Sequence, residues 1–474
     1  MASEFIYIRT IEDCVKQIEA LSQFEELAAD TETYVLPKYK NMGIGSALDP
    51  HTASISLLIL RPQEGPTRIF DLIELERADY DRTLLLQLLQ SRKTLIYFNA
   101  RFDVKFLLAY FGVLLRNSCC VRLLAKLIAN AVGSKFGRMT GHSLKDVCRD
   151  YLGIHMTGKG EEQVSDWYAR PDFDNPEDEY ATLMWNDKLV YGCGDVEHLF
   201  QLREMMLETL TLPLPKTLLI PEGSETGPFG LGMSRVVETE MEMIAVTAEM
   251  EYNGLPTSRE LLGQIQAAIY DETTGEGELM ELASKLCAEF GLEAYPSPWC
   301  DYMMPTAPSL KALNNPNKLK SLISQRIGVQ LDNVQASVLE RMIDLLDELG
   351  KTGEVEFVDE DEAELFGELR MLEESVVMQT CDLARLVVKY KQLEKQRAMN
   401  LLKYINPVTG AICSNFDQLG AATGRSSAAR PNSQQISGRV KVTVERSLDN
   451  LFPPPAPEVN EKECNQTTYS YPQI

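Results

Sequence analysis

The pattern of hydrophobic and polar positions over the first 200 or so residues changes repeatedly between the period of a strand and that of a helix. Residues 27–29 predict the end of a strand that places Asp30 at its edge, and residues 52–60 and 67–73 predict an antiparallel hairpin. Further segments predict a strand at 94–98 and helices at 102–111, 143–153 and 188–207. This order of elements favours an α/β fold, in which helices flank a mixed sheet.

The second half of the chain has mainly helical patterns. Proline and glycine cluster over residues 212–232, which predicts a linker. Ser234 can cap a helix that runs to about Tyr252 and ends at Asn253-Gly254. Further long helices are expected at 259–291, 333–350 and 361–405, and a proline-rich disordered tail after Arg446.

Length and charge narrow the interpretation. A chain of 474 residues favours two or three domains. The net charge of −24 argues against nucleic-acid binding by bulk electrostatics, but residues 380–446 carry eleven Lys/Arg against four Asp/Glu, which indicates a local backbone-contacting surface. Because the sequence has no long apolar run and no secretory signal, we expect no membrane association and a cytoplasmic location, in a bacterial cell or a phage-infected host.

Four carboxylates and one phenol occur in three short motifs. The motifs are Asp30-Thr31-Glu32, Asn99-x-x-Phe102-Asp103 and Tyr191-x-x-x-Asp195. Each is common by itself, as a solvated acid or a helix cap. In this order they supply the rigid acidic ligands that two divalent cations about 4 Å apart require, an arrangement suited to phosphodiester hydrolysis.

This spacing resembles the 3′–5′ exonucleases of the RNase H-like superfamily, in their tyrosine-bearing DEDD subtype. Ser165-Asp166-Trp167 lies between the second and third motifs and strengthens the resemblance. One departure is that the family often has an aspartate near the start of the following helix, where this chain has Cys119-Cys120-Val121-Arg122. The resemblance implies an RNase H-like α/β exonuclease domain.

The same resemblance implies two divalent cations, Mg²⁺ or Mn²⁺, and a role for each residue of the three motifs. Asp30 would bridge both metals. Glu32 and Asp195 would complete the site of the metal that activates water, and Asp103 would hold the second metal. Tyr191 would position the attacking water rather than remove its proton, because free tyrosine titrates near pH 10.

A second block, Thr423-Gly424-Arg425-Ser426-Ser427 with Pro431-Asn432-x-Gln434, resembles DNA polymerases of the bacterial polymerase I type, family A. Residues 240–254 resemble the helix that opens the polymerase region, and residues 389–395 the thumb helix that follows the DNA backbone. Arg425 would enter the minor groove at the primer terminus, where acceptors are common to all base pairs. The residues implied to bind single-stranded or primer–template DNA are Leu36, Asn99, Lys389, Lys391, Lys395, Arg425, Asn432 and Gln434.

Nothing after Gln434 resembles the palm and fingers that polymerisation requires. The expected domains are an exonuclease (1–211), a linker (212–232), a helical, truncated polymerase region with thumb and start of palm (233–436) and an unmatched tail (437–474). An intron or intein, a frameshift or a naturally split polymerase would each give such an ending.

Three functions fit these observations. The first is a magnesium-dependent, proofreading 3′–5′ exodeoxyribonuclease of a truncated or split family A polymerase used in DNA replication, unable to polymerise alone. The second is a non-catalytic half that complements a separate palm–fingers polypeptide. The third is an RNA-trimming nuclease of ribonuclease D type, against which the Thr423–Gln434 block argues.

Overall fold

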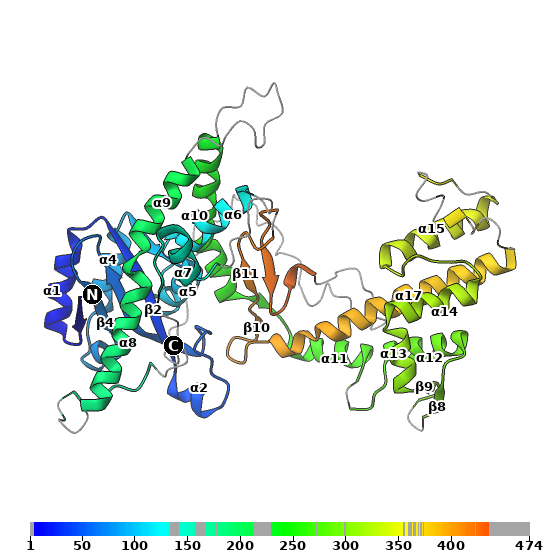
Figure 1. The fold of residues 1–474 in the computed structure, drawn as a ribbon. Helices are drawn as coiled ribbons and strands as arrows, with labels where there is room; N and C mark the ends of the chain where they lie inside the picture. The colour runs from blue at the N-terminus through cyan, green and yellow to red at the C-terminus, as the bar shows by residue number, and fades with distance from the viewer. Residues whose placement is uncertain are drawn as a thin grey trace, which may run out of the picture. The chain divides into compact units, whose positions relative to one another are not determined.

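The computed structural model divides into two compact units (Figure 1). Unit 1 comprises residues up to Leu255 together with Asn406–Gln435, and unit 2 comprises Pro256–Ile405. The residues that the structure describes are 4–132, 142–156, 167–173, 175, 179–211, 229–271, 273–297, 300–353, 356–358, 363, 366, 367, 369, 372, 374–421 and 423–435. The expected tail, most of the expected linker, and Ser165 and Asp166 lie outside these residues.

A six-stranded mixed sheet forms the centre of unit 1, with strand order β1-β4-β3-β2-β5-β6. The hairpin predicted from the sequence is present, because β3 pairs antiparallel with both β2 and β4, whereas β5 runs parallel to β2. The bounds of the strands are β1 (Phe5–Ile8), β2 (Glu26–Val35), β3 (Ala53–Arg61), β4 (Thr67–Asp71), β5 (Thr94–Tyr97) and β6 (Ser118–Cys120). The α/β class predicted from the sequence is confirmed.

Helices cover this sheet. The central strand β3 is buried along nearly its whole length, with Leu57–Leu60 fully enclosed, and both α5 and α8 contact it. A strand covered on both faces needs an almost continuous apolar run, and Leu57–Leu60 supply it. The bounds of the helices are α1 (Ile11–Ser22), α2 (Pro37–Asn41), α3 (Leu72–Arg77), α4 (Arg82–Ser91), α5 (Ala100–Phe111), α6 (Val121–Val132), α7 (Leu144–Val147), a π-helical turn (Cys148–Leu152), α8 (Glu179–Glu197) and α9 (Leu199–Thr211).

Two segments that the sequence assigns to the polymerase region pack within unit 1. They are α10 (Phe229–Asn253) and residues 406–435, with the short strands β10 (Ala411–Ile412), β11 (Asn415–Asp417) and β12 (Ser427–Ala429). Helix α10 lies against α5, α9 and α6. It begins at Phe229, so Ser234 lies inside the helix and the prediction that it caps the helix is wrong.

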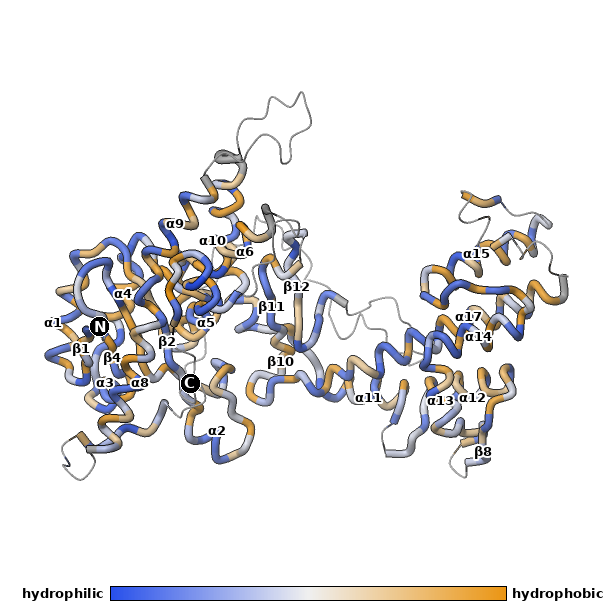
Figure 2. The backbone as a smooth tube through the Cα atoms, in the orientation of Figure 1, coloured by the Kyte–Doolittle hydropathy of each residue, from blue (hydrophilic) through white to orange (hydrophobic). Residues whose placement is uncertain are grey.

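Unit 2 is mainly helical and has its own apolar core, which includes Leu286, Leu339 and Val387. Hydrophobic and polar segments alternate along its helices, as Figure 2 shows. The long helix expected at 259–291 is two helices, since the first ends at Ile269 and the second begins at Glu278, and Gly275 and Gly277 between them have φ of 73° and 127°. The bounds are α11 (Arg259–Ile269), α12 (Glu278–Phe290), β8 (Ala294–Pro296), β9 (Met303–Pro305), α13 (Ala307–Leu313), α14 (Pro316–Ile327), α15 (Ala336–Thr352) and α17 (Glu374–Met399).

Within the described ranges, no helix combines the length and the apolar character needed to cross a membrane.

Candidate metal centre

Strand β2 supplies two carboxylates to one site. Asp30 and Glu32 are separated by one residue, so their side chains leave the same face of the strand. The strand does not end at Asp30, as the sequence suggested, but continues to Val35 through a register shift between Glu32 and Thr33. A bulge of this kind redirects the strand, and bulges are frequent beside active sites.

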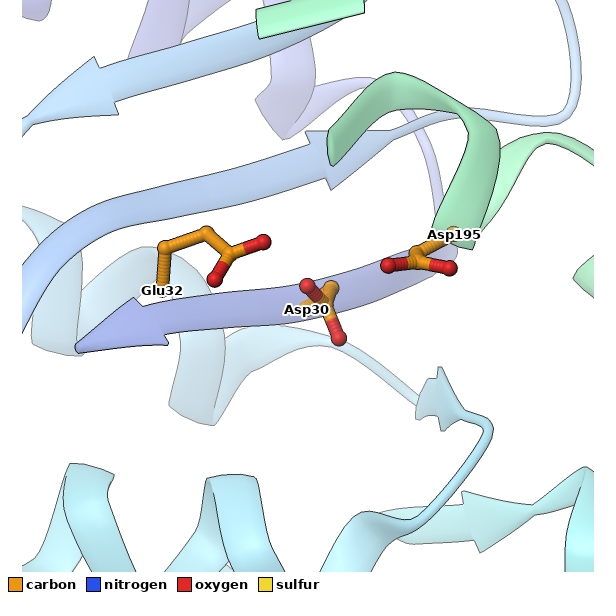
Figure 3. A group of neighbouring side chains, drawn as sticks. All are labelled: Asp30, Glu32 and Asp195. Atoms are coloured by element: carbon orange, nitrogen blue, oxygen red, sulfur yellow. The ribbon is translucent and has the colours of Figure 1, made fainter. Parts of the chain in front are cut away.

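Helix α8 brings a third carboxylate to this pair (Figure 3). Oxygen atoms of Asp30, Glu32 and Asp195 lie within 4.8 Å of one another, although Asp195 is more than 160 residues away along the chain. The helix packs closely on β3 at Gly192, where a Cβ atom would lie 2.6 Å from Cδ1 of Ile59. A small residue at this position therefore lets the helix segment that carries Tyr191 and Asp195 approach the sheet.

Asp103 is the fourth carboxylate, and it is almost completely buried in the first turn of α5. Its Oδ1 accepts hydrogen bonds from the Thr31 amide at 3.0 Å and the Thr31 hydroxyl at 2.8 Å. Burial raises the pKa of Asp103 to about 7, the bonds from Thr31 counteract this rise, and the nearby Asp195 carboxylate adds to it. A cation beside this carboxyl group would favour the ionised form and so lower its pKa.

The four carboxylates face a single cavity of about 720 Å³. Leu36, which was expected to wedge against the terminal base, is not among the described residues that line it. This side chain is half-buried before α2 and packs against the core. The predicted site residues that the cavity brings together are Asp30, Glu32, Asn99, Asp103, Tyr191 and Asp195.

The polar residues of the cavity lining that the sequence interpretation missed include Arg122, His142 and Asp146. Arg122 donates from Nη1 to Oδ1 of Asn99 at 3.1 Å. Burial lowers the pKa of His142, and the charges of Lys126 and Arg122 lower it further. Of these residues, only Arg122 stands out in the sequence, because it lies in Cys119-Cys120-Val121-Arg122, where the family often has an aspartate.

The donor set fits a hard divalent cation. Carboxylate oxygens are the ligands that Mg²⁺ and Mn²⁺ prefer, and Asp30, Glu32 and Asp195 present three of them within one ion's reach. This acidic cluster can hold a metal.

The lysines predicted to bind DNA lie on α17 in unit 2, and two of them make other contacts. Lys389 pairs with Glu278, and Nζ of Lys391 donates to the Val334 carbonyl. Burial lowers the pKa of Lys391. Lys395 is exposed. Their contact with DNA remains a prediction.

The Thr423–Gln434 block belongs to unit 1. Arg425 is exposed just before β12, and Gln434 lies in a short helical turn, with Nε2 3.5 Å from the Ser426 carbonyl. Asn432 is partly buried, and its Oδ1 has no hydrogen-bond partner among the described residues. Their DNA contacts also remain predictions.

Residues 5–211 match a family model described as the 3′–5′ exonuclease domain of DNA polymerase A. The six-stranded sheet and the acidic cluster both lie within the matched residues, which are similar to a 3′–5′ exonuclease domain. Along most of its length the chain is similar to DNA polymerase I of Aquifex aeolicus (strain VF5), with 23% identity over 452 residues. These residues are 95% of this chain and 61% of that relative, so the chain spans about three fifths of the relative's length. The expected likeness to polymerase I is confirmed.

One of the similar solved structures supports the fold. The polymerase domain of Pol1 from M. smegmatis, in complex with DNA primer–template and dNTP, is 16% identical. The match covers 92% of this chain and 56% of that one, with a TM-score of 0.51. Brucella melitensis NrnC is 20% identical and matches 53% of this chain and 93% of its own, but a TM-score of 0.34 supports no conclusion.

Proposed function

We propose that this chain is a divalent-metal-dependent exonuclease that removes nucleotides from the 3′ ends of DNA and proofreads for a family A polymerase. The observation that carries the proposal is the convergence of Asp30, Glu32 and Asp195 within 4.8 Å, beside buried Asp103 and in a cavity that Tyr191 also lines. Three carboxylates that face one another at this distance repel, and a divalent cation between them would offset that repulsion.

Two cations would be held by four residues. Asp30, Glu32 and Asp195 would hold the first, while Asp30 and Asp103 would hold the second. Divalent cations in this position supply charge stabilisation at the phosphorus centre and a lower pKa for the attacking water. The hydrogen bonds from Thr31 keep one oxygen of Asp103 in place and leave Oδ2 for a cation or its water.

Tyr191 would orient the attacking water through its hydroxyl group. It precedes Asp195 by one helical turn on α8, so the phenol and the carboxylate lie on one face of the helix. The packing of α8 on β3 at Gly192 holds this face against the cavity. Correct placement of a nucleophile contributes to catalysis because it removes the entropy cost of finding the reactive geometry.

DNA is the proposed substrate because of the polymerase-like block. The Thr423–Gln434 segment resembles a reader of the primer terminus, and it packs in the same unit as the exonuclease sheet. An enzyme that trims RNA has no need of such a reader. A chain that carries both is suited to removing a mispaired 3′ nucleotide before a polymerase continues synthesis.

The test incubates the purified chain with 5′-labelled single-stranded DNA and Mg²⁺, beside an Asp30→Ala, Glu32→Ala double variant. Stepwise shortening from the 3′ end, abolished by EDTA and in the double variant, is the expected result. RNA of the same sequence is run in parallel, and a 3′-mispaired duplex is compared with a paired one.

Two outcomes would count against the proposal. A folded wild type that degrades neither nucleic acid would rule out an exonuclease that works alone. Faster degradation of RNA than of DNA would instead replace proofreading with RNA trimming. Circular dichroism of both proteins shows whether the substitutions preserve the fold.

A further inference from the structure

The nuclease cavity is strongly acidic, yet it must accept a polyanion. Asp30, Glu32, Asp103, Asp146 and Asp195 all line it. Among the described lining residues, Arg122 is the one arginine or lysine. The approach of a phosphodiester strand to such a surface is repulsive unless cations or basic side chains offset the charge.

Three basic residues of α5 and α6 are paired with carboxylates, whereas Arg122 has no carboxylate partner among the described residues. Arg101 lies 3.1 Å and Lys105 3.0 Å from oxygens of Glu251, and Lys126 pairs with Asp417. Among the described residues, no carboxylate lies within ion-pairing distance of Arg122. Its hydrogen bond to Asn99 satisfies one N–H group but does not neutralise the charge.

The position of Arg122 also works against helix stability. It lies in the first turn of α6, where the helix dipole is positive and a basic side chain is unfavourable. Lys126, one turn later, has its carboxylate partner and is nearly buried. The contribution of Arg122 to folding therefore does not explain why an arginine is present here.

We infer that Arg122 binds a backbone phosphate of the substrate strand beside the scissile linkage. Guanidinium groups bind phosphate oxygens through two parallel N–H donors, and the bond to Asn99 would hold the side chain in that orientation. The charge of Arg122 would also offset part of the repulsion from the acidic cluster. This inference rests on the proposed nuclease function and names the substrate atoms that one of its residues recognises.

The test compares wild type with Arg122→Gln and Arg122→Lys on single-stranded DNA. We expect Arg122→Gln to lower kcat/KM roughly 10- to 100-fold, mainly through KM, and Arg122→Lys to recover part of the loss. The slope of log(kcat/KM) against log[salt] should become shallower by about 0.7, the value for one phosphate contact on a single strand. The matched control is Arg77→Gln, which removes an exposed arginine that pairs with Glu74 on α3.

DNA substrates with one uncharged linkage identify which phosphate Arg122 contacts. A methylphosphonate is placed at each of the last few linkages in turn, and each substrate is cleaved by wild type and by Arg122→Gln. If Arg122 binds one of these phosphates, the penalty at that linkage disappears in the variant, because the two changes remove the same interaction.

Two results overturn the inference. If Arg122 only orients Asn99, every methylphosphonate penalty will be the same in the variant as in wild type, and the salt slope will not change. This result refutes the inference alone, provided that wild type degrades DNA. If the folded wild type degrades no DNA, the proposed function and this inference both fail.

Discussion

Thr31 holds Asp103 through two hydrogen bonds to the same carboxylate oxygen, from its amide and from its hydroxyl. The two residues are 72 positions apart, and Thr31 stands between the two acids of β2. One residue therefore fixes the position of the helix α5 carboxylate relative to both strand carboxylates. This contact ties together the two elements on which the proposed second metal depends.

We predict that Thr31→Val lowers exonuclease activity and Mn²⁺ affinity roughly 10- to 100-fold, as expected when an outer partner of a metal ligand is lost. Valine keeps the size and the strand preference of threonine but removes the hydroxyl donor, so Asp103 keeps only the amide bond. Steady-state kinetics and Mn²⁺ titration monitored by electron paramagnetic resonance measure the two effects.

Thr33→Val is the matched control for this prediction. Thr33 is also buried on β2, and its hydroxyl donates to the Ala47 carbonyl at 2.7 Å, away from the carboxylates. Both variants lose one buried hydrogen bond, so both should lose similar stability, but only Thr31→Val should lose metal affinity. Equal activity of the two variants would show that the bond to Asp103 is only structural.

Removing a proposed metal ligand should lower activity more than removing a residue that hydrogen-bonds to a ligand, such as Thr31. We predict that Asp195→Asn lowers activity more than about a hundredfold and abolishes one class of Mn²⁺ sites, since amide oxygen carries no charge to hold the ion. Asp187→Asn serves as the control, because Asp187 is an exposed acid on the same helix. Retention of full metal affinity by Asp195→Asn would exclude Asp195 as a ligand.

If Tyr191 only positions the attacking water, its loss should lower kcat without changing metal affinity. We predict that Tyr191→Phe lowers kcat about 10- to 100-fold through loss of water positioning, with Mn²⁺ affinity and KM unchanged. Tyr180→Phe, on the same helix with a side chain that is 76% exposed, should behave like wild type. A fall in Mn²⁺ affinity in Tyr191→Phe would point to a role in holding the metal instead.

The acidic cluster is predictable from the sequence because short spacings fix local geometry. Residues i and i+2 share a strand face, and i and i+4 share a helix face, so the spacing alone pairs Asp30 with Glu32 and Tyr191 with Asp195. That these pairs meet in one cavity follows from the family resemblance. The strands and helices that carry these residues are also predictable, because the local spacing of apolar residues distinguishes a strand from a helix.

Tertiary contacts are not predictable in this way. Apart from the departure at Cys119-Cys120-Val121-Arg122, nothing in the sequence near Arg122 or His142 indicates that they line the same cavity as Asp30, because chain segments far apart meet there. The sequence also places the end of β2 too early, since the charged positions at 30 and 32 resemble a loop, whereas pairing with β3 keeps them extended. Ser234 has the residue type of a helix cap, but α10 has already begun at Phe229.

Glu251 of α10 anchors the polymerase-like segments of unit 1 to the helix that carries Asp103. Its carboxylate lies 3.0 Å from Lys105 and 3.1 Å from Arg101, both on α5. Its Oε1 also accepts the backbone N–H of Phe416 in β11 at 2.6 Å. This buried carboxylate therefore joins α10, α5 and β11. Its loss would remove the acidic partner of both Arg101 and Lys105.

We therefore predict that Glu251→Ala lowers the unfolding free energy of unit 1 by about 3–5 kcal/mol, the usual cost of removing one partner of a buried ion pair. The measurement is chemical unfolding followed by tryptophan fluorescence in a Trp299→Phe background, which leaves Trp167 and Trp185 as reporters, both in unit 1. Glu249→Ala, at an exposed position on the same helix, should change the unfolding free energy by less than about 0.5 kcal/mol. If Glu251→Ala is no less stable than Glu249→Ala, the buried network does not hold α10 and β11 against α5. A parallel loss of nuclease activity in folded Glu251→Ala would show that this anchor also sets the position of Asp103.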